Sequence, residues 1–150
     1  MKNSKMPAAI FFAAAFFLAD RLIKILFLKY YYAVKIPLVS DFLSLKLAFN
    51  SGIAFSLPFS GWPVIIFSAI IILLIGIIII KKIIAKDYLL VAPLSLIFFG
   101  AASNFLDRLR VGQVIDYIDL KYFTIFNLAD IMIVVGTLWL FWLLRNQKSL

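Results

Sequence analysis

Long apolar runs separated by short polar segments dominate the chain. Residues 62–80 and 88–106 are each free of charged side chains. A bilayer is crossed by a helix of about 20 apolar residues, so each run is predicted to form a membrane-spanning helix. Pro63 and Pro93 lie near the predicted helix starts, where the missing N–H of proline costs least.

Two more helices are predicted toward the two ends of the chain. The first covers about residues 6–28, because the apolar run continues beyond a polar interruption at residues 20–24. The basic residues before it resemble the start of a signal peptide, but no small-residue cleavage motif is well placed, so we expect an uncleaved span. The fourth helix covers about residues 126–144 and carries Asp130 in its first turn.

The connection between the first two helices has a different pattern. Hydrophobic residues alternate with other residues between positions 43 and 49, and Pro37 and Pro58 bound the segment. This period is typical of short strands, so we expect a small β-like cradle outside the membrane. The predicted fold class is an all-α membrane protein with four transmembrane helices and this cradle, and residues 1–150 form a single integral membrane domain.

The composition and charge of the chain are consistent with an integral membrane protein. Hydrophobic residues make up 65% of the chain, and its net charge is +8. Basic proteins often bind nucleic acid, but here the cations separate apolar runs, so we expect no nucleic-acid partner. Lys and Arg are dense in the short connection 81–87 and at both termini, and such segments usually stay in the cytoplasm. We therefore expect cytoplasmic termini and two extracytoplasmic longer connections.

The predicted topology gathers the chemically useful residues at one face of the membrane. The ends of helices one and three and the start of helix four all emerge there. With no His or Cys in the chain, imidazole, thiolate and common zinc chemistry are excluded. The polar residues at this face are Asp20, Lys24, Asn50, Asn104, Asp107, Arg108, Asp116, Asn127 and Asp130.

Each of these residues also has a purely structural explanation. Charges at the helix ends can extend toward water, as the pair Asp20 and Lys24 would do. Asn127 can cap the fourth helix, and Asp130 is a favourable anion in its first turn. Asp116 can be a solvated loop carboxylate. No single residue therefore decides the function.

Four motifs together resemble the prolipoprotein signal peptidase family, the type II signal peptidases, across nearly the whole chain. The segment from Asp20 to Lys24 is similar to the family's D-x-x-x-K, and the segment 49–56 to its N-x-G-x-A-F. Residues 100–108 resemble G-x-x-x-N-x-x-D-R, whereas 114–117 and 126–130 resemble V-V-D-F and F-N-x-A-D. The chain departs from the family at Phe99 and Ser103, where glycine is usual.

The resemblance implies an aspartic-type endopeptidase of the bacterial cytoplasmic (inner) membrane, with its active site at the extracytoplasmic face. It would cleave diacylglyceryl-modified prolipoproteins on the N-terminal side of the lipidated cysteine. Two close carboxylates share one proton and can activate water, and the resemblance assigns these roles to Asp116 and Asp130. We expect no cofactor or metal, contacts with membrane lipids, and a monomer.

The resemblance and the side-chain chemistry also suggest supporting roles. The substrate-binding or dyad-supporting residues are expected to be Asn104, Arg108, Asn127, Asn50 and Gly52. A structural polar network is expected from Asp20, Lys24 and Asp107. Asp107 has a second possible role, because a third carboxylate near a dyad would tune its pKa.

Two rival functions are compatible with parts of the sequence. In a serine/lysine hydrolase, Lys24 would activate Ser51 or Ser56. In a small transporter or channel component, the membrane Asp and Lys residues would carry protons or ions. The chain shows no internal repeat of the kind seen in many transporters.

Overall fold

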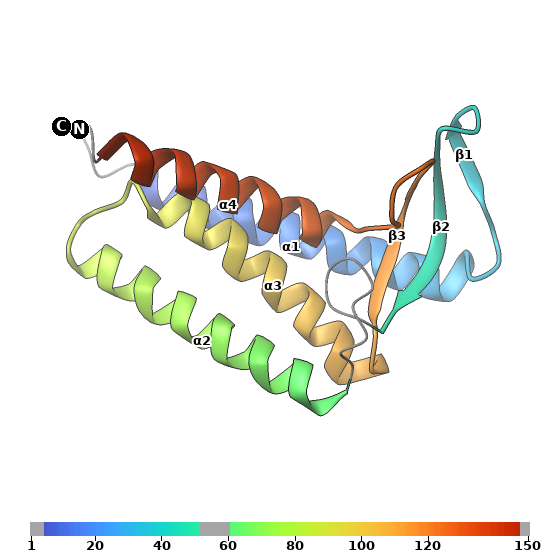
Figure 1. The fold of residues 1–150 in the computed structure, drawn as a ribbon, viewed down its shortest axis with the longest axis horizontal. Helices are drawn as coiled ribbons and strands as arrows, with labels where there is room; N and C mark the ends of the chain where they lie inside the picture. The colour runs from blue at the N-terminus through green and yellow to red at the C-terminus, as the bar shows by residue number, and fades with distance from the viewer. Residues whose placement is uncertain (1–4, 52–60, 148–150) are drawn as a thin grey trace.

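Four helices run side by side, and a small sheet lies at one end of the bundle (Figure 1). The computed structural model describes residues 5–51 and 61–147. The N-terminal end of α1 and the C-terminal end of α4 lie together at the end opposite the sheet. The elements in chain order are α1 (Lys5–Tyr30), β1 (Ile36–Val39), β2 (Leu43–Asn50), α2 (Trp62–Ile84), α3 (Val91–Val111), β3 (Val114–Leu120) and α4 (Leu128–Gln147).

The helices do not end where the charge-free runs end. Expected boundaries of 6–28, 62–80, 88–106 and 126–144 become those given above, so the C-terminal ends lie two to five residues later. Backbone hydrogen bonds within a helix do not depend on side-chain polarity, so charged residues continue the last turns. The end of α3 is set instead by Gly112, which is left-handed (φ 76°) and donates its N–H to the Arg108 carbonyl at 3.1 Å.

Two helices meet the length and hydropathy expected of a membrane span. They are Trp62–Ile84 and the segment Leu128–Asn146 of α4, among the residues that the structure describes. The other two helices, α1 and α3, carry several charges near the sheet end. The expectation of four spanning helices therefore stays a prediction.

The expected cradle is a three-stranded antiparallel sheet in the order β1-β2-β3. Strands β1 and β2 come from the predicted segment between the first two helices. The third strand comes from the connection between α3 and α4, with Leu120 opposite Leu43 and Val114 opposite Asn50. Two aspartates made this connection resemble a loop in the sequence. Because β3 carries Asp116, the sheet holds this carboxylate in a fixed place.

Helix α3 is the centre of the bundle, because it packs against α1, α2 and α4, whereas α2 packs mainly against α3. Two glycines allow α3 and α4 to approach closely. A Cβ atom at Gly100 would lie 2.6 Å from the Ala129 carbonyl oxygen, and one at Gly136 would lie 2.8 Å from the Pro93 carbonyl oxygen. Both distances are too short for a side chain, so these glycines set the distance between the two helices.

Candidate active site

Asp116 is buried in the middle of β3, with only 2% of its surface exposed. Its Oδ1 accepts a hydrogen bond from Asn127 Nδ2 at 2.6 Å, and its Oδ2 accepts one from Asn50 Nδ2 at 3.3 Å. A solvated loop carboxylate would not have this environment. Asn50 comes from the end of β2, so the cradle contributes directly to the surroundings of Asp116.

The start of α4 forms a reciprocal capping arrangement. Asn127 Oδ1 accepts from the Asp130 backbone N–H at 2.9 Å, and Asp130 Oδ2 accepts from the Asn127 backbone N–H at 3.1 Å. This is the pattern of a capping box, which satisfies N–H groups that a helix start leaves free. The structural explanation for these two residues therefore holds. The side-chain amide of Asn127 still points to Asp116, so capping and site contact occur together.

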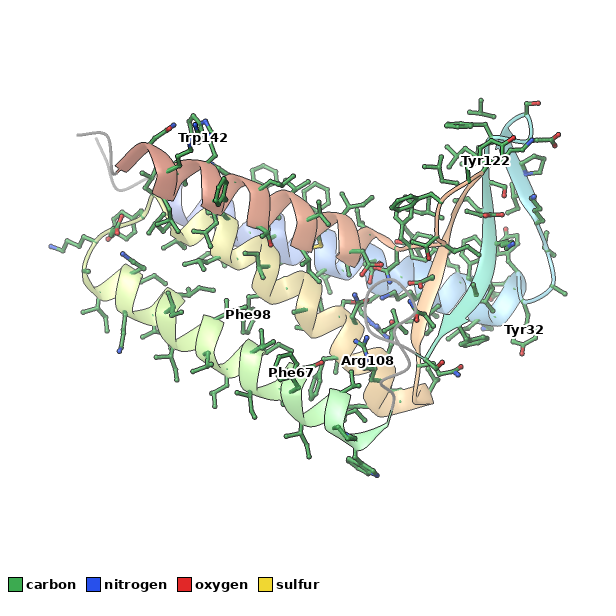
Figure 2. All side chains as sticks on the ribbon, viewed as in Figure 1. Tyr32, Phe67, Phe98, Arg108, Tyr122 and Trp142 are labelled. Atoms are coloured by element: carbon green, nitrogen blue, oxygen red, sulfur yellow. The ribbon has the colours of Figure 1, made fainter. Side chains whose placement is uncertain are left out.

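Asn104 of α3 connects the surroundings of the two aspartates. Its Nδ2 donates to Asp130 Oδ1 at 2.7 Å, and its Oδ1 accepts from Asn127 Nδ2 at 3.1 Å. A continuous chain of amide hydrogen bonds thus runs from Asp130 through Asn104 and Asn127 to Asp116. Arg108 lies one turn further along α3, at its sheet end (Figure 2), and donates to the Asn104 carbonyl at 3.4 Å.

A fully buried ionic network supports this site from α1. Lys24 lies 2.8 Å from Asp20 and 2.7 Å from Asp107, and it also donates to Asn104 Oδ1 at 3.1 Å. The side chains of Lys24, Asp20 and Asp107 have no exposed surface. The alternative in which these helix-end charges extend into water is therefore wrong. Within the described residues, Lys24 contacts Asp20, Asp107 and Asn104 and no serine, which argues against Lys24 as the base of a serine/lysine pair.

Three residues of this network were not predicted from the sequence. Arg21 forms an ion pair with Asp107 and donates to the Ser103 carbonyl at 3.2 Å. Ser103 and Tyr117 donate their hydroxyl hydrogens to Asp20, at 2.6 and 2.9 Å. The sequence offered one indication of their role, because all three residues lie inside or beside the four family motifs. Contacts between residues more than 80 positions apart cannot be read from local spacing.

The two departures from the family pattern have structural roles in this chain. Ser103 is buried and bonds to Asp20, as described above. Phe99 packs against Phe17 of α1, with ring centroids 5.8 Å apart. Side chains at both positions therefore join α1 to α3. Gly52 and Ser56 lie outside the described residues, and Ser51 is exposed.

The comparisons with known proteins agree with this arrangement. The family model described as signal peptidase (SPase) II matches residues 12–145. The lipoprotein signal peptidase of Desulfitobacterium hafniense (strain DSM 10664 / DCB-2) is 38% identical over 136 residues, which cover 87% of this chain and 89% of the relative. The lipoprotein signal peptidase of Coxiella burnetii (strain RSA 493 / Nine Mile phase I) is 36% identical over 146 residues, covering 90% and 88%.

The chain belongs to the signal peptidase II family. It is therefore a peptidase. A solved structure described as a bacterial membrane enzyme has a TM-score of 0.82 and 26% identity, and the match covers 96% of this chain and 91% of that one. A second structure with the same description has a TM-score of 0.76 and 27% identity, with 93% of each chain covered.

In this member of the family, the environment of Asp116 changes its acidity. Burial and the nearby negative charge of Asp130 raise the pKa of Asp116 to about 6, against the smaller opposing effects of Asn127, Asn50 and Lys24. A carboxyl group with this pKa keeps a proton at mildly acidic pH. Within residues 5–51 and 61–147, no cluster of three acidic side chains is placed to hold a metal ion.

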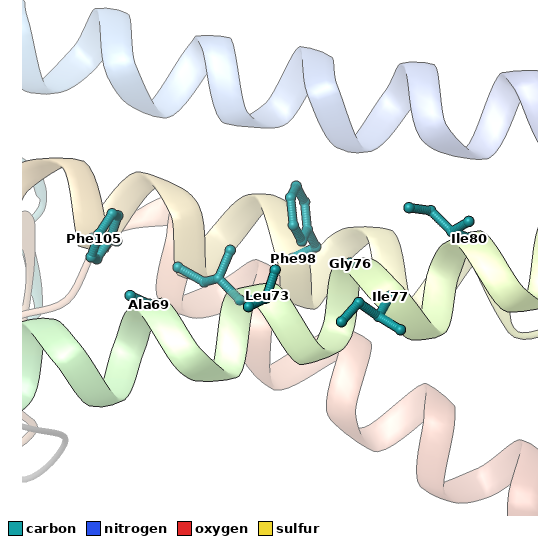
Figure 3. Close-up of a pocket in the computed structure, with 8 residues that line it drawn as sticks. Ala69, Leu73, Gly76, Ile77, Ile80, Phe98 and Phe105 are labelled. Carbon is teal, nitrogen blue, oxygen red and sulfur yellow. The ribbon is translucent and has the colours of Figure 1, made fainter.

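An apolar groove of about 410 Å³ lies between α2 and α3 (Figure 3). One end is at Phe105, which is the neighbour of Asn104 in α3, and the groove extends along the bundle to Ile80 of α2. The other lining residues are Ala69, Ile72, Leu73, Gly76, Ile77 and Phe98. No charged side chain lines the groove, so it suits a hydrocarbon ligand.

Proposed function

We propose that this member of the signal peptidase II family removes signal peptides from diacylglyceryl-modified prolipoproteins with Asp116 and Asp130 as its catalytic dyad. Membership of the family gives removal of signal peptides from prolipoproteins. The observation that supports the dyad is the chain of amide hydrogen bonds that connects the two carboxylates through Asn104 and Asn127. The proposed cut is on the N-terminal side of the lipidated cysteine.

The two carboxylates have different environments, which suggests different roles. Asp130 lies in the first turn of α4, where the helix dipole and the Asn127 N–H favour a carboxylate. Asp116 lies in β3, away from any helix start, and its burial raises its pKa, so we place the shared proton on Asp116. Asp130 then takes a proton from water, and the water oxygen bonds to the scissile carbonyl carbon while Asp116 donates its proton to the carbonyl oxygen. The tetrahedral intermediate collapses when Asp130 passes its proton to the amine nitrogen, the C–N bond breaks and Asp116 takes back the hydroxyl proton.

The neighbouring side chains have positioning roles in this mechanism. Asn104 donates a hydrogen bond to one oxygen of Asp130, and Asn127 donates one to Asp116. Asn50 donates to the second oxygen of Asp116. Arg108 provides positive charge close enough to act on both members of the dyad. Asp20, Lys24 and Asp107 form the buried ionic network beneath them. The role expected for Gly52 in shaping the cradle is part of the same proposal.

The substrate's lipid is proposed to place one acyl chain in the groove between α2 and α3. The groove is apolar along its length and begins at Phe105, next to the dyad-supporting Asn104. Because Phe105 and Asn104 are consecutive in α3, this end of the groove lies at the same level of the bundle as the proposed dyad. The peptide would lie over the cradle side, where Asn50 approaches Asp116.

The proposed topology has four membrane-spanning helices, cytoplasmic termini and a single membrane domain in the bacterial inner membrane. All four helices have at least 20 residues, which is enough to cross a bilayer. The chain acts as a monomer in this proposal. Because it has no cysteine, single cysteines at Lys86 and Lys46 can be labelled cleanly. In intact spheroplasts, a membrane-impermeant maleimide should modify position 46 and not position 86, and the reverse labelling would contradict the orientation.

The dyad is tested with purified protein in detergent and a diacylglyceryl-modified prolipoprotein, with cleavage followed by gel shift. Asp116→Asn and Asp130→Asn should each lose essentially all turnover while remaining folded. Asp119→Asn is the matched control, because it changes another carboxylate of β3 that bonds to Ser44 and lies near two lysines. The control should retain activity. Full activity in either dyad variant would contradict the assignment.

A further inference from the structure

Tyr117 follows Asp116 in β3 and reaches across to the start of α4. Its ring is buried and stacks on Phe27 of α1, with centroids 5.7 Å apart and an interplanar angle of 18°. Its hydroxyl donates to Asp20 Oδ1 at 2.9 Å and accepts from the Leu128 backbone N–H at 3.1 Å. One phenol therefore contacts α1 and α4 while its own backbone belongs to β3.

The first turn of α4 is held from three sides. Tyr117 binds the Leu128 N–H, Asp20 Oδ1 binds the Ala129 N–H at 3.3 Å, and Asn127 Oδ1 binds the Asp130 N–H. Groups that a helix start normally leaves to water are here satisfied by side chains of β3, α1 and the cap. The hydroxyl stays protonated, because burial and the negative charge of Asp20 raise the pKa of Tyr117.

We propose that the Tyr117 hydroxyl is a positioning group that sets the distance between Asp116 and Asp130. Asp116 is joined to Tyr117 by one peptide bond, and Asp130 lies two residues after Leu128. The bond from Leu128 N–H to the phenol therefore ties together the two segments that carry the dyad. Misplacement of a catalytic group by about 1 Å can lower the rate about a hundredfold.

The proposal rests on the aspartyl dyad and is tested with Tyr117→Phe, which removes the hydroxyl and keeps the stacked ring. We expect kcat for prolipoprotein cleavage to fall at least about tenfold, with KM changed less than about twofold, because the hydroxyl bonds to Asp20 and Leu128. Tyr31→Phe is the matched control. The Tyr31 ring also contacts Phe27, at 5.5 Å, but Tyr31 lies just after the end of α1 and kcat should be unchanged.

The pH profile of kcat separates positioning from simple stabilisation. The charged groups that act on Asp116 are Asp130 of α4, Lys24 of α1 and Arg108 of α3. If the first turn of α4 moves away, Asp130 raises the pKa of Asp116 less, so the alkaline limb of the profile should move to lower pH. A lower melting temperature with unchanged kcat and an unchanged profile would overturn the proposal.

A second variant removes the other half of the same hydrogen bond. Leu128→Pro deletes the N–H at the first position of α4, where proline is well tolerated. If the bond matters, the rate losses of Tyr117→Phe and Leu128→Pro should not be additive in the double variant. Additive losses would overturn the proposal. Should Asp116→Asn remain active, the dyad itself fails; inactive dyad variants with unchanged kcat in Tyr117→Phe would reject only the positioning role.

Discussion

The sheet end of the bundle and the seam between α2 and α3 are held together by different forces. At the sheet end, buried charges and amides from α1, α3, β3 and α4 bond to one another, and within the described residues no buried side-chain nitrogen or oxygen lacks a partner. The α2–α3 seam is apolar and contains an open groove. Directional bonds specify one arrangement, whereas apolar contact tolerates adjustment. The more exactly specified end of the bundle is thus the one that holds Asp116 and Asp130.

The largest loss of stability should come from removing the ammonium group of Lys24 at the sheet end of the bundle. Lys24→Met would leave Asp20 and Asp107 buried with only Arg21 to balance them, which typically costs about 3–5 kcal/mol. Thermal unfolding in detergent measures this loss. The double variant Lys24→Met/Asp20→Asn restores the charge balance and should recover part of it. Lys82→Met breaks a partly exposed pair with Asp87 and should cost at most about 1 kcal/mol.

The next effect concerns the pH dependence of stability. The pKa of Asp116 is about 6 in the folded protein, whereas the ordinary value for an aspartate is 3.8. An acid with a raised pKa binds its proton more tightly when folded, so the folded state loses stability as pH rises from about 4 to 6. The loss is about 3 kcal/mol, at 1.36 kcal/mol per pKa unit. Asp116→Asn should remove this dependence.

Melting temperatures of wild type and Asp116→Asn at pH 4, 5, 6 and 7 test whether the wild type loses stability as pH rises. The variant should gain relative to wild type as pH rises and then remain level. If the difference in melting temperature between the two proteins is the same at every pH, ionisation of Asp116 does not destabilise the folded state. Asp119→Asn serves as the control, because its carboxylate bonds to Ser44 and lies near two lysines, so neutralising it should not reproduce the gain.

A pair of glycine substitutions compares the two helix contacts directly. Gly100→Ala places a methyl group 2.6 Å from the Ala129 carbonyl and should cost about 1–3 kcal/mol and lower the cleavage rate, because α4 must move. Gly76→Ala places its methyl group 3.4 Å from the Phe98 ring, at the edge of ordinary contact. It should be neutral or gain up to about 1 kcal/mol from helix propensity. Equal losses of stability in the two variants would show that the α3–α4 and α2–α3 contacts are packed equally tightly.

The smallest effect is expected from filling the groove. Ala69→Phe should reduce kcat/KM for a diacylated substrate a few-fold, about 1 kcal/mol, without changing the melting temperature much. Leu74→Phe is the control, because Leu74 is on α2, is 53% exposed and does not line the groove. Matching losses in both variants would indicate that the groove is not the acyl site.

Much of this architecture followed from the sequence, and the errors have physical causes. Apolar runs predicted the helices, and alternation at residues 43–49 predicted the cradle. Strand β3 was missed because its two aspartates resemble loop residues, although Asp116 gains its partners only through pairing with β2 and docking of Asn127. Helix ends were misplaced because charge was taken as a boundary.

The family motifs predicted more of the site residues than the chemistry of individual side chains did. The expected polar residues within the described segments lie together at the sheet end. Arg21, Ser103 and Tyr117 were missed because their partners are distant in sequence. A serine in a glycine position and a tyrosine in a phenylalanine position each add one hydroxyl, and both hydroxyls bind Asp20. Only the folded bundle shows that these two changes serve the same carboxylate.

The bond between Asp20 and the Ala129 N–H joins the first helix to the last. A ribosome must make more than a hundred residues after Asp20 before this partner exists. Until then, Lys24 has its partner Asp20 in α1 but lacks Asp107 and Asn104, and Arg21 lacks Asp107. The buried network around Asp20 therefore becomes complete only after the last helix has been made, so its final contacts form after translation of α4.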